Sequence, residues 1–170
     1  MAFYSFQLQS DLSTQGALDI IQKLARERPG FGQSLKESFG WRPEDNPPFI
    51  GKVEGNEFSF YRDIRGRNSF LPRIRGRVLA YRNGSRIEVN MYLHPLVILF
   101  MLFWLGGVGS AAASMLWRGK GTEALVPLGM FVFGLLMILG GFYPEAIKAR
   151  RILEERIQRE ERERMGLGTR

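Results

Sequence analysis

Residues 95–117 read PLVILFMLFWLGGVGSAAASMLW, and residues 124–143 read ALVPLGMFVFGLLMILGGFY. Neither stretch contains a charged residue. A bilayer core about 30 Å thick is crossed by about 20 helical residues, so each stretch is long enough to span it. A chain of 170 residues is too short to bury two such helices inside a soluble core. The two stretches therefore predict two transmembrane helices.

The two predicted spans are joined by only six residues, Arg118–Glu123, which predicts a tight transmembrane hairpin with both chain ends on one side. Lysine and arginine are concentrated outside the hairpin. Five lie between residues 73 and 94 and five between residues 148 and 159, against two in the loop. Because positive residues favour the cytoplasmic side, we expect both termini in the cytoplasm.

The first span carries a stripe of small residues. Gly106, Ser110 and Ser114 recur every four residues, and Gly107 and Ala111 repeat that spacing one position later. Small residues allow helix backbones to approach closely in a membrane. We favour the second span of the same chain as the partner of this stripe, with another subunit as the alternative. Neither span contains Asp, Glu, Lys or Arg, which argues against a transporter or a proton pathway.

The segment before the membrane begins with a helical pattern. Residues 11–28 have apolar side chains at helical spacing and predict an amphipathic helix with Ser13 or Thr14 as its N-cap. The spacing of aromatic residues from Phe31 allows a second short helix, and the proline-rich stretch 41–48 predicts a linker.

From residue 49 the hydrophobic period becomes 2, which predicts an antiparallel β module. Residues 49–53 and 57–64 predict one strand pair, and residues 69–82 and 85–92 predict a second pair around the turn Asn83-Gly84. That turn fixes the register, because a slip of one residue would mix the two faces. The predicted pairs are Arg82–Ser85, Ala80–Ile87, Val78–Val89 and Gly76–Met91.

The net charge of +7 lies entirely in this module. Residues 62–86 contain eight Arg and one acid, and the rest of the chain has 16 basic and 16 acidic residues. The alternation places Arg73, Arg75 and Arg77 together on one face of the sheet. The candidate binding residues are Arg62, Arg65, Arg67, Arg73, Arg75, Arg77 and Arg86.

Anionic lipid headgroups are the nearest source of phosphate for these arginines, because only two residues separate the last predicted strand from the first span. An acidic protein at the membrane surface is an alternative partner, and a solvated face that only reports topology is another. Nucleic-acid phosphates would also attract arginine, but the tether to the membrane favours lipid.

The sequence shows no catalytic, cofactor-binding or metal-binding constellation. Without Cys and with a single His, thiolate and multi-histidine metal sites are excluded. We expect His94 to cap or anchor the start of the first span. Glu57 and Asp63 are isolated acids, a weak signal for acid–base chemistry. We therefore expect no enzyme and no cofactor.

After the second span, residues 145–165 carry a thin apolar stripe among charged pairs and predict a helix that continues the span. The predicted fold class is thus an α+β membrane protein: an N-terminal amphipathic helix, an antiparallel module of about four strands, a transmembrane hairpin and a C-terminal cytoplasmic helix. The predicted units are 1–48 (helical region and linker), 49–93 (β module), 94–144 (hairpin) and 145–170 (charged helix).

Several motifs point to a known group of proteins. The segments FIGKV at 49–53, NEFSF at 56–60, NSFLPRIRG at 68–76 and HPL at 94–96 resemble small uncharacterised bacterial two-span membrane proteins that share an Asn-Ser-Phe-Leu-Pro strand motif. The resemblance covers about residues 49–117 and implies a bacterial inner-membrane location without an activity. The plan is also loosely similar to bacterial pleckstrin-homology-like membrane proteins.

We therefore expect a non-enzymatic integral membrane protein whose arginine-rich β module contacts anionic headgroups or an acidic partner. The alternative is an accessory or assembly subunit of a larger membrane complex, or a homo-oligomer, that packs through the small-residue stripe of the first span.

Overall fold

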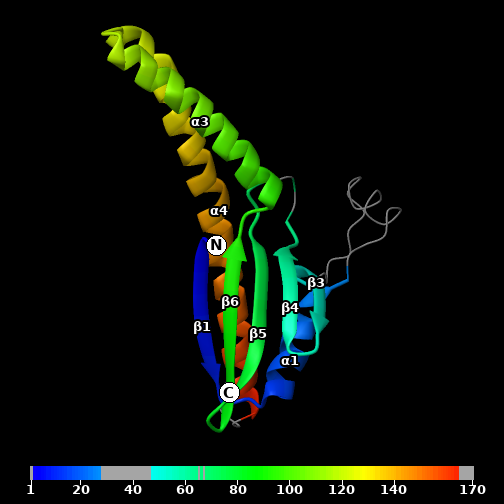
Figure 1. Cartoon of the computed structure of the whole chain (residues 1–170). Helices are drawn as coiled ribbons and strands as arrows, with labels where there is room; N and C mark the ends of the chain where they lie inside the picture. The colour runs from blue at the N-terminus through cyan, green and yellow to red at the C-terminus, as the bar shows by residue number, and fades with distance from the viewer. Residues whose placement is uncertain (1, 28–46, 65, 67, 165–170) are drawn as a thin grey trace.

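The computed structural model describes residues 2–27, 47–64, 66 and 68–164. They form a six-stranded sheet of order β1-β6-β5-β4-β3-β2, together with two long helices and one short one. The strands are β1 Tyr4–Ser10, β2 Ala25–Arg26, β3 Phe49–Glu54, β4 Glu57–Arg62, β5 Arg73–Tyr81 and β6 Gly84–Tyr92. The helices are α1 Thr14–Lys23, α3 Pro95–Trp117 and α4 Gly121–Arg164. In Figure 1 the hairpin of α3 and α4 rises from one end of the sheet.

One face of the sheet packs against α1 and the C-terminal half of α4 (Figure 1). Alternate strand residues such as Ile74 and Val89 are buried in this core, as the period of 2 predicts. The thin stripe predicted on the C-terminal helix supplies the other side, where Ala149 and Leu153 are fully buried. The second span and the charged C-terminal segment form one helix of 44 residues that belongs to both the hairpin and the sheet core.

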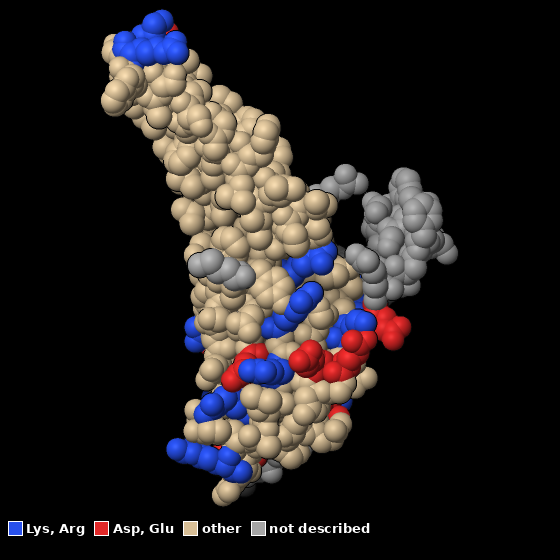
Figure 2. All heavy atoms as spheres, in the orientation of Figure 1, with Lys and Arg blue, Asp and Glu red and all other residues tan. Residues whose placement is uncertain are grey.

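The hairpin exposes most of its apolar surface. In the most apolar stretch of α3 only 11% of the residues are buried inside the structure, and in that of α4 only 17% are buried. Phe103 is 82% exposed and Trp117 is 92% exposed. Figure 2 shows an uncharged surface between the base of the hairpin and its tip. A core helix of a soluble protein would be mostly buried, so α3 and α4 are two helices that are long and apolar enough to span a membrane.

The small-residue stripe does not face α4, so our preferred expectation for it is wrong. A Cβ atom added at Gly106 or Gly107 would meet no atom within 4 Å. The close approach of the two helices uses a glycine of α4 instead, since a Cβ at Gly134 would lie 3.0 Å from the Leu105 side chain. The stripe residues that are exposed are Gly106, Gly107, Ser110 and Ser114, and Ala111 is half-buried.

The β5–β6 hairpin is displaced by two residues from the predicted register, so all four predicted pairs are wrong. Val78 lies opposite Ile87 rather than Val89. The two-residue loop is Arg82-Asn83, and Arg82 adopts a φ of 52°. Because the displacement is an even number of residues, every side chain keeps its predicted face.

The position of Gly84 explains the displacement. Gly84 belongs to β6, where the end of β1 crosses it so closely that a Cβ atom would lie 2.1 Å from the Ser10 carbonyl oxygen. Glycine is needed here for close approach of another strand. The turn therefore moves by one residue, from Asn83-Gly84 to Arg82-Asn83, which displaces the pairing register by two residues.

Two strands were not expected from the sequence. β1 pairs with β6 over its whole length, and the short β2 pairs in parallel with β3. The module of about four strands is therefore a six-stranded sheet that recruits the N-terminal region. α1 is shorter than the predicted helix 11–28, and the Ser13 hydroxyl accepts a hydrogen bond from the Gly16 N–H. The possible helix from Phe31 lies outside the described residues, as does most of the linker.

The Asn-Ser-Phe-Leu-Pro motif connects the sheet to α4 and forms a loop rather than the predicted start of a strand. The Asn68 amide donates to the Gly141 carbonyl oxygen over 2.9 Å, and its own oxygen accepts from the Phe70 N–H. A Cβ atom at Gly141 would lie 2.8 Å from the Phe70 Cβ, so Phe70 packs directly on the helix backbone. The contact lies one turn before Pro144, which has no N–H to donate within α4.

Candidate functional site

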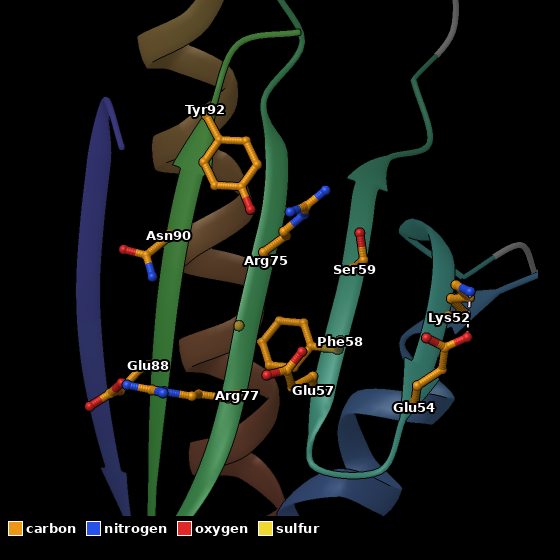
Figure 3. Close-up of a pocket in the computed structure, with 11 residues that line it drawn as sticks. Lys52, Glu54, Glu57, Phe58, Ser59, Arg75, Arg77, Glu88, Asn90 and Tyr92 are labelled. Atoms are coloured by element: carbon orange, nitrogen blue, oxygen red, sulfur yellow. Dashed lines mark hydrogen bonds and ion pairs between the residues drawn. The ribbon is translucent and has the colours of Figure 1, made fainter. Parts of the chain in front are cut away.

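The face of the sheet turned away from α1 and α4 carries three cross-strand rows of side chains. Figure 3 draws the middle and lower rows, together with Tyr92 of the upper row. The upper row is nearest the apolar hairpin and contains Tyr61, Arg73 and Tyr92. The middle row contains Lys52, Ser59, Arg75 and Asn90. The lower row contains Glu54, Glu57, Arg77 and Glu88.

The strand geometry sets the spacing of these rows. Neighbours on one face of a strand are two residues apart, so successive rows are separated by about 7 Å. Tyr92 precedes the start of α3 by three residues. The upper row therefore lies at the base of the hairpin, and the lower row lies about 13 Å further from it.

The rows border a hollow on the sheet surface. A groove of about 620 Å³ is lined by side chains of the middle and lower rows and by Tyr92. A second groove of about 460 Å³ adjoins it and includes Arg73 and Tyr61. The two grooves share Lys52, Ser59 and Arg75, so the middle row lies where they meet.

The ion pairs within the rows leave an uneven distribution of free charge. The Arg77 Nε donates to Glu88 Oε2 over 2.8 Å, and Lys52 pairs with Glu54. Among the described residues, Arg73 and Arg75 have no carboxylate oxygen within 4.0 Å, and Glu57 has no cationic partner within that distance. Among the residues that the structure describes, the cations without an acidic partner therefore lie in the upper and middle rows, and the acid without a basic partner lies in the lower row.

Arg75 extends from the middle row towards Tyr92 (Figure 3), and its Cζ lies 5.4 Å from the centre of the Tyr92 ring. Burial raises the pKa of the Tyr92 phenol, and the positive charge of Arg75 opposes part of that rise. The phenol is therefore protonated at neutral pH and can donate a hydrogen bond. With Ser59 it supplies neutral donors near the Arg75 guanidinium (Figure 3), an arrangement suited to binding an oxyanion.

The remaining predicted arginines have other places. Arg62 forms an ion pair with Glu145 of α4. Arg86 stacks on Tyr81, with its Cζ 3.7 Å from the ring centre, near the end of the sheet opposite the hairpin. Arg65 and Arg67 lie outside the described residues. The structure thus brings Arg73, Arg75 and Arg77 together, as predicted, and uses Arg62 and Arg86 in contacts with other elements.

Several residues of the site are not predicted from the sequence, which are Lys52, Ser59, Asn90 and Tyr92, and the sequence indicates Glu57 only as an isolated acid. A signal for Ser59 was present, because the alternation places it with Tyr61 on the polar side of β4. The register of β4 against β5 is what unites these residues, and no tight turn specifies it, because a long loop joins the two strands.

Asp63, the other isolated acid, and His94, the expected cap of the first span, both have structural partners. Asp63 pairs with Arg26 over 2.8 Å. His94 is the N-cap of α3, and its Nδ1 accepts a hydrogen bond from the Leu96 N–H over 3.2 Å. Within the described ranges there is no group of three or more His, Cys, Asp or Glu side chains placed to hold a metal ion.

The site as described can hold an anion at the guanidinium groups of Arg73 and Arg75, with an acidic row beyond it. Comparison of the chain with protein-family models, curated proteins and solved structures finds no match. Its function is therefore inferred from the geometry of this face.

Proposed function

We propose that the protein is a non-enzymatic integral membrane protein whose sheet binds the phosphate of lipid headgroups through Arg73 and Arg75. The observation that carries this proposal is the position of these two arginines. They lack acidic partners among the described residues, and they lie at the end of the sheet nearest to the apolar hairpin. An acidic protein at the membrane surface would use the same two guanidinium groups.

The order of chemical groups along the molecule matches a membrane surface. With α3 and α4 in the hydrocarbon core, the headgroups lie at the level of Leu93 and His94, next to the upper row. In Figure 2 basic side chains lie directly below the uncharged hairpin, and acidic side chains lie further away. Cations near the headgroup phosphates and acids away from them are the electrostatically favourable order.

Distance and pairing single out Arg73 and Arg75 among the predicted arginines. Arg77 is paired with Glu88. Arg86 is six residues from Tyr92 along β6, about 20 Å further from the hairpin. Each basic residue near an anionic surface contributes about 1 kcal/mol, so these two arginines together contribute about 2 kcal/mol.

The proposal includes the bacterial inner membrane with both chain ends in the cytoplasm. The described ends, Ala2 and Arg164, both lie on the sheet side of the hairpin (Figure 1). The tip of the hairpin has only Arg118 and Lys120 as basic residues, which supports this orientation.

The test is the phospholipid retained by the full chain after purification in a mild detergent. The double variant Arg73→Gln/Arg75→Gln should bind headgroup phosphate about 30-fold more weakly, because about 2 kcal/mol is removed. The matched control Arg156→Gln/Arg159→Gln removes two exposed arginines of α4 that lie about 20 Å or more beyond Tyr143. Equal retention by the double variant and the wild type would refute the proposal.

A second candidate function is an accessory or assembly subunit of a larger membrane complex. The specific observation in its favour is that α4 leaves the Gly106 and Gly107 face of α3 uncovered. Substitution Gly107→Ile should then reduce a complex seen in mild detergent to the monomer, whereas Gly129→Ile, on an open face of α4, should not. A wild-type chain that is monomeric and carries no second protein would exclude this candidate.

A further inference from the structure

The groove of about 620 Å³, on the sheet face turned away from α1 and α4, has a cation in its middle row and an acid in its lower row, and neither has an ion-pair partner among the described residues. Ser59 lies opposite Arg75 and Glu57 lies opposite Arg77, so Glu57 is one row further from the hairpin than Arg75. Arg75 and Glu57 both line the groove of about 620 Å³. The free cation is thus on the membrane side of the hollow, and the free acid is on the distal side.

These two residues do not neutralise each other. Neither has an ion pair within 4.0 Å among the described residues, although they are diagonal neighbours on adjacent strands. Arg75 turns towards Tyr92 and away from Glu57 (Figure 3). The other charges that line the groove are already paired: Lys52 with Glu54, and Arg77 with Glu88.

A ligand that pairs with both Arg75 and Glu57 must therefore carry a negative group nearer to the membrane and a positive group further from it. In a phospholipid with an amino headgroup, the phosphate is attached to the membrane-bound glycerol and the ammonium is at the outer end. Only two carbons join the phosphate oxygen to the ammonium of this headgroup, so both charged groups can lie in the groove of about 620 Å³ that Arg75 and Glu57 line. The order of charges in this headgroup is the same as the order of Arg75 and Glu57 in the groove.

We propose that the groove binds a zwitterionic headgroup of the phosphoethanolamine class. The phosphate lies at Arg75, with donors from Tyr92 and Ser59, and the primary ammonium lies at Glu57. This inference rests on the proposed function, because the phosphate uses the same arginine. It adds that the lower row selects one headgroup among those that carry a phosphate.

The chemistry of other headgroups explains the selection. A glycerol headgroup carries the phosphate but brings no cation to the carboxylate of Glu57. A trimethylammonium group brings a cation but has no N–H to donate. A primary ammonium has three N–H donors, and a charge-assisted hydrogen bond to a carboxylate is about twice as strong as a neutral one.

The test is a competition between two lipids for the full chain. The purified protein in mild detergent is mixed with equal amounts of phosphatidylethanolamine and phosphatidylglycerol, and the bound lipids are counted by native mass spectrometry. The wild type should retain more phosphatidylethanolamine. Glu57→Gln should lower the ratio of the two lipids about tenfold without loss of phosphatidylglycerol. Arg75→Gln should reduce the binding of both.

The control is Glu155→Gln, an exposed acid of α4 that should leave the ratio unchanged. Glu57 is exposed, so its replacement should leave the thermal unfolding of the chain unaltered. The charge reversal Glu57→Lys should turn the preference towards phosphatidylglycerol.

The outcomes separate the two proposals. An unchanged ratio in Glu57→Gln, together with reduced binding of both lipids in Arg75→Gln, overturns the headgroup selection and leaves the proposed function standing. Binding of both lipids that is unaffected in Arg75→Gln and in the double arginine variant overturns both proposals.

Discussion

At the scale of the residue, Gly140 and Gly141 are adjacent on α4 but have different surroundings. A Cβ atom at Gly141 would lie 2.8 Å from the Phe70 Cβ, whereas a Cβ atom at Gly140 would meet nothing within 4 Å. Gly141→Ala should therefore destabilise the protein by about 1–3 kcal/mol, because Phe70 must move off the helix. Gly140→Ala should be neutral or stabilising by about 0.5–1 kcal/mol, since glycine is unfavourable inside a helix.

Thermal unfolding of the two variants in the same detergent measures this difference. A Gly141→Ala protein as stable as the Gly140→Ala protein would mean that the Asn-Ser-Phe-Leu-Pro loop does not dock on α4.

Tyr92 gives a second prediction at this scale. Burial raises the pKa of Tyr92 in the folded chain above the usual tyrosine pKa of about 10. The stability that the neutral phenol contributes is therefore fully present below about pH 10, and it is lost as the pH rises through the raised pKa. Tyr92→Phe should therefore lose less stability than the wild type between neutral and strongly alkaline pH. Removal of the Arg75 charge should raise the pKa of Tyr92 further, which a spectroscopic titration of the phenolate can follow. A titration that Arg75→Gln leaves unchanged would contradict the Arg75–Tyr92 contact.

At the scale of the element, α4 connects the apolar hairpin to the sheet core through one continuous helix. Leu153 is fully buried in that core. Leu153→Ala should destabilise the sheet by about 2–5 kcal/mol, through lost burial and a residual cavity. Glu155→Ala, an exposed position two residues later, should change the stability by less than about 0.5 kcal/mol. The free energies of unfolding of the two variants should differ accordingly, and equal values would show that α4 is not docked on the sheet.

The strands show which part of a sheet the sequence can predict. The period of 2 correctly places Arg73, Arg75 and Arg77 on one face of β5, with Ile74 and Val78 buried on the other. The β5–β6 register depends on the approach of β1 to Gly84, a contact between distant segments that a local turn preference cannot include. β1 itself alternates apolar Tyr4, Phe6 and Leu8 with polar residues, so its strand signal was present but short. The two residues of β2 carry no periodic signal.

At the scale of the whole molecule, the concentration of positive charge between residues 62 and 86 is clear in the sequence, but its arrangement in space is not. Arg62 turns to α4, Arg86 stacks near the far end of the sheet, and only Arg73 and Arg75 combine proximity to the hairpin with the lack of an acidic partner among the described residues. The acids Glu54 and Glu57 that line the groove come from β3 and β4. The fold sets the register of β4 against β5 and of β3 against β4. Arg73, Arg75 and Arg77 therefore share one face of β5, as the alternation predicts, whereas Arg62 and Arg86 have contacts elsewhere.

The absence of cysteine from the chain allows a nitroxide label to be placed at a single introduced cysteine. Ser5 and Gln9 are both exposed on β1, Ser5 lies opposite Asn90 of the middle row, and Gln9 lies opposite Arg86. The two label sites are thus matched in strand and face, and differ by about 13 Å in distance from the hairpin.

The full chain carrying one label is reconstituted in a bilayer, and the relaxation of the lipid phosphorus NMR signal by the nitroxide is measured. This measurement tests the binding of headgroup phosphate at the middle row. The label at Ser5→Cys should relax the phosphorus strongly, the label at Gln9→Cys weakly, and the Arg73→Gln/Arg75→Gln background should diminish the effect at Ser5→Cys. Equal relaxation from the two labels, or an effect at Ser5→Cys that the arginine substitutions leave unchanged, would contradict phosphate binding by Arg73 and Arg75.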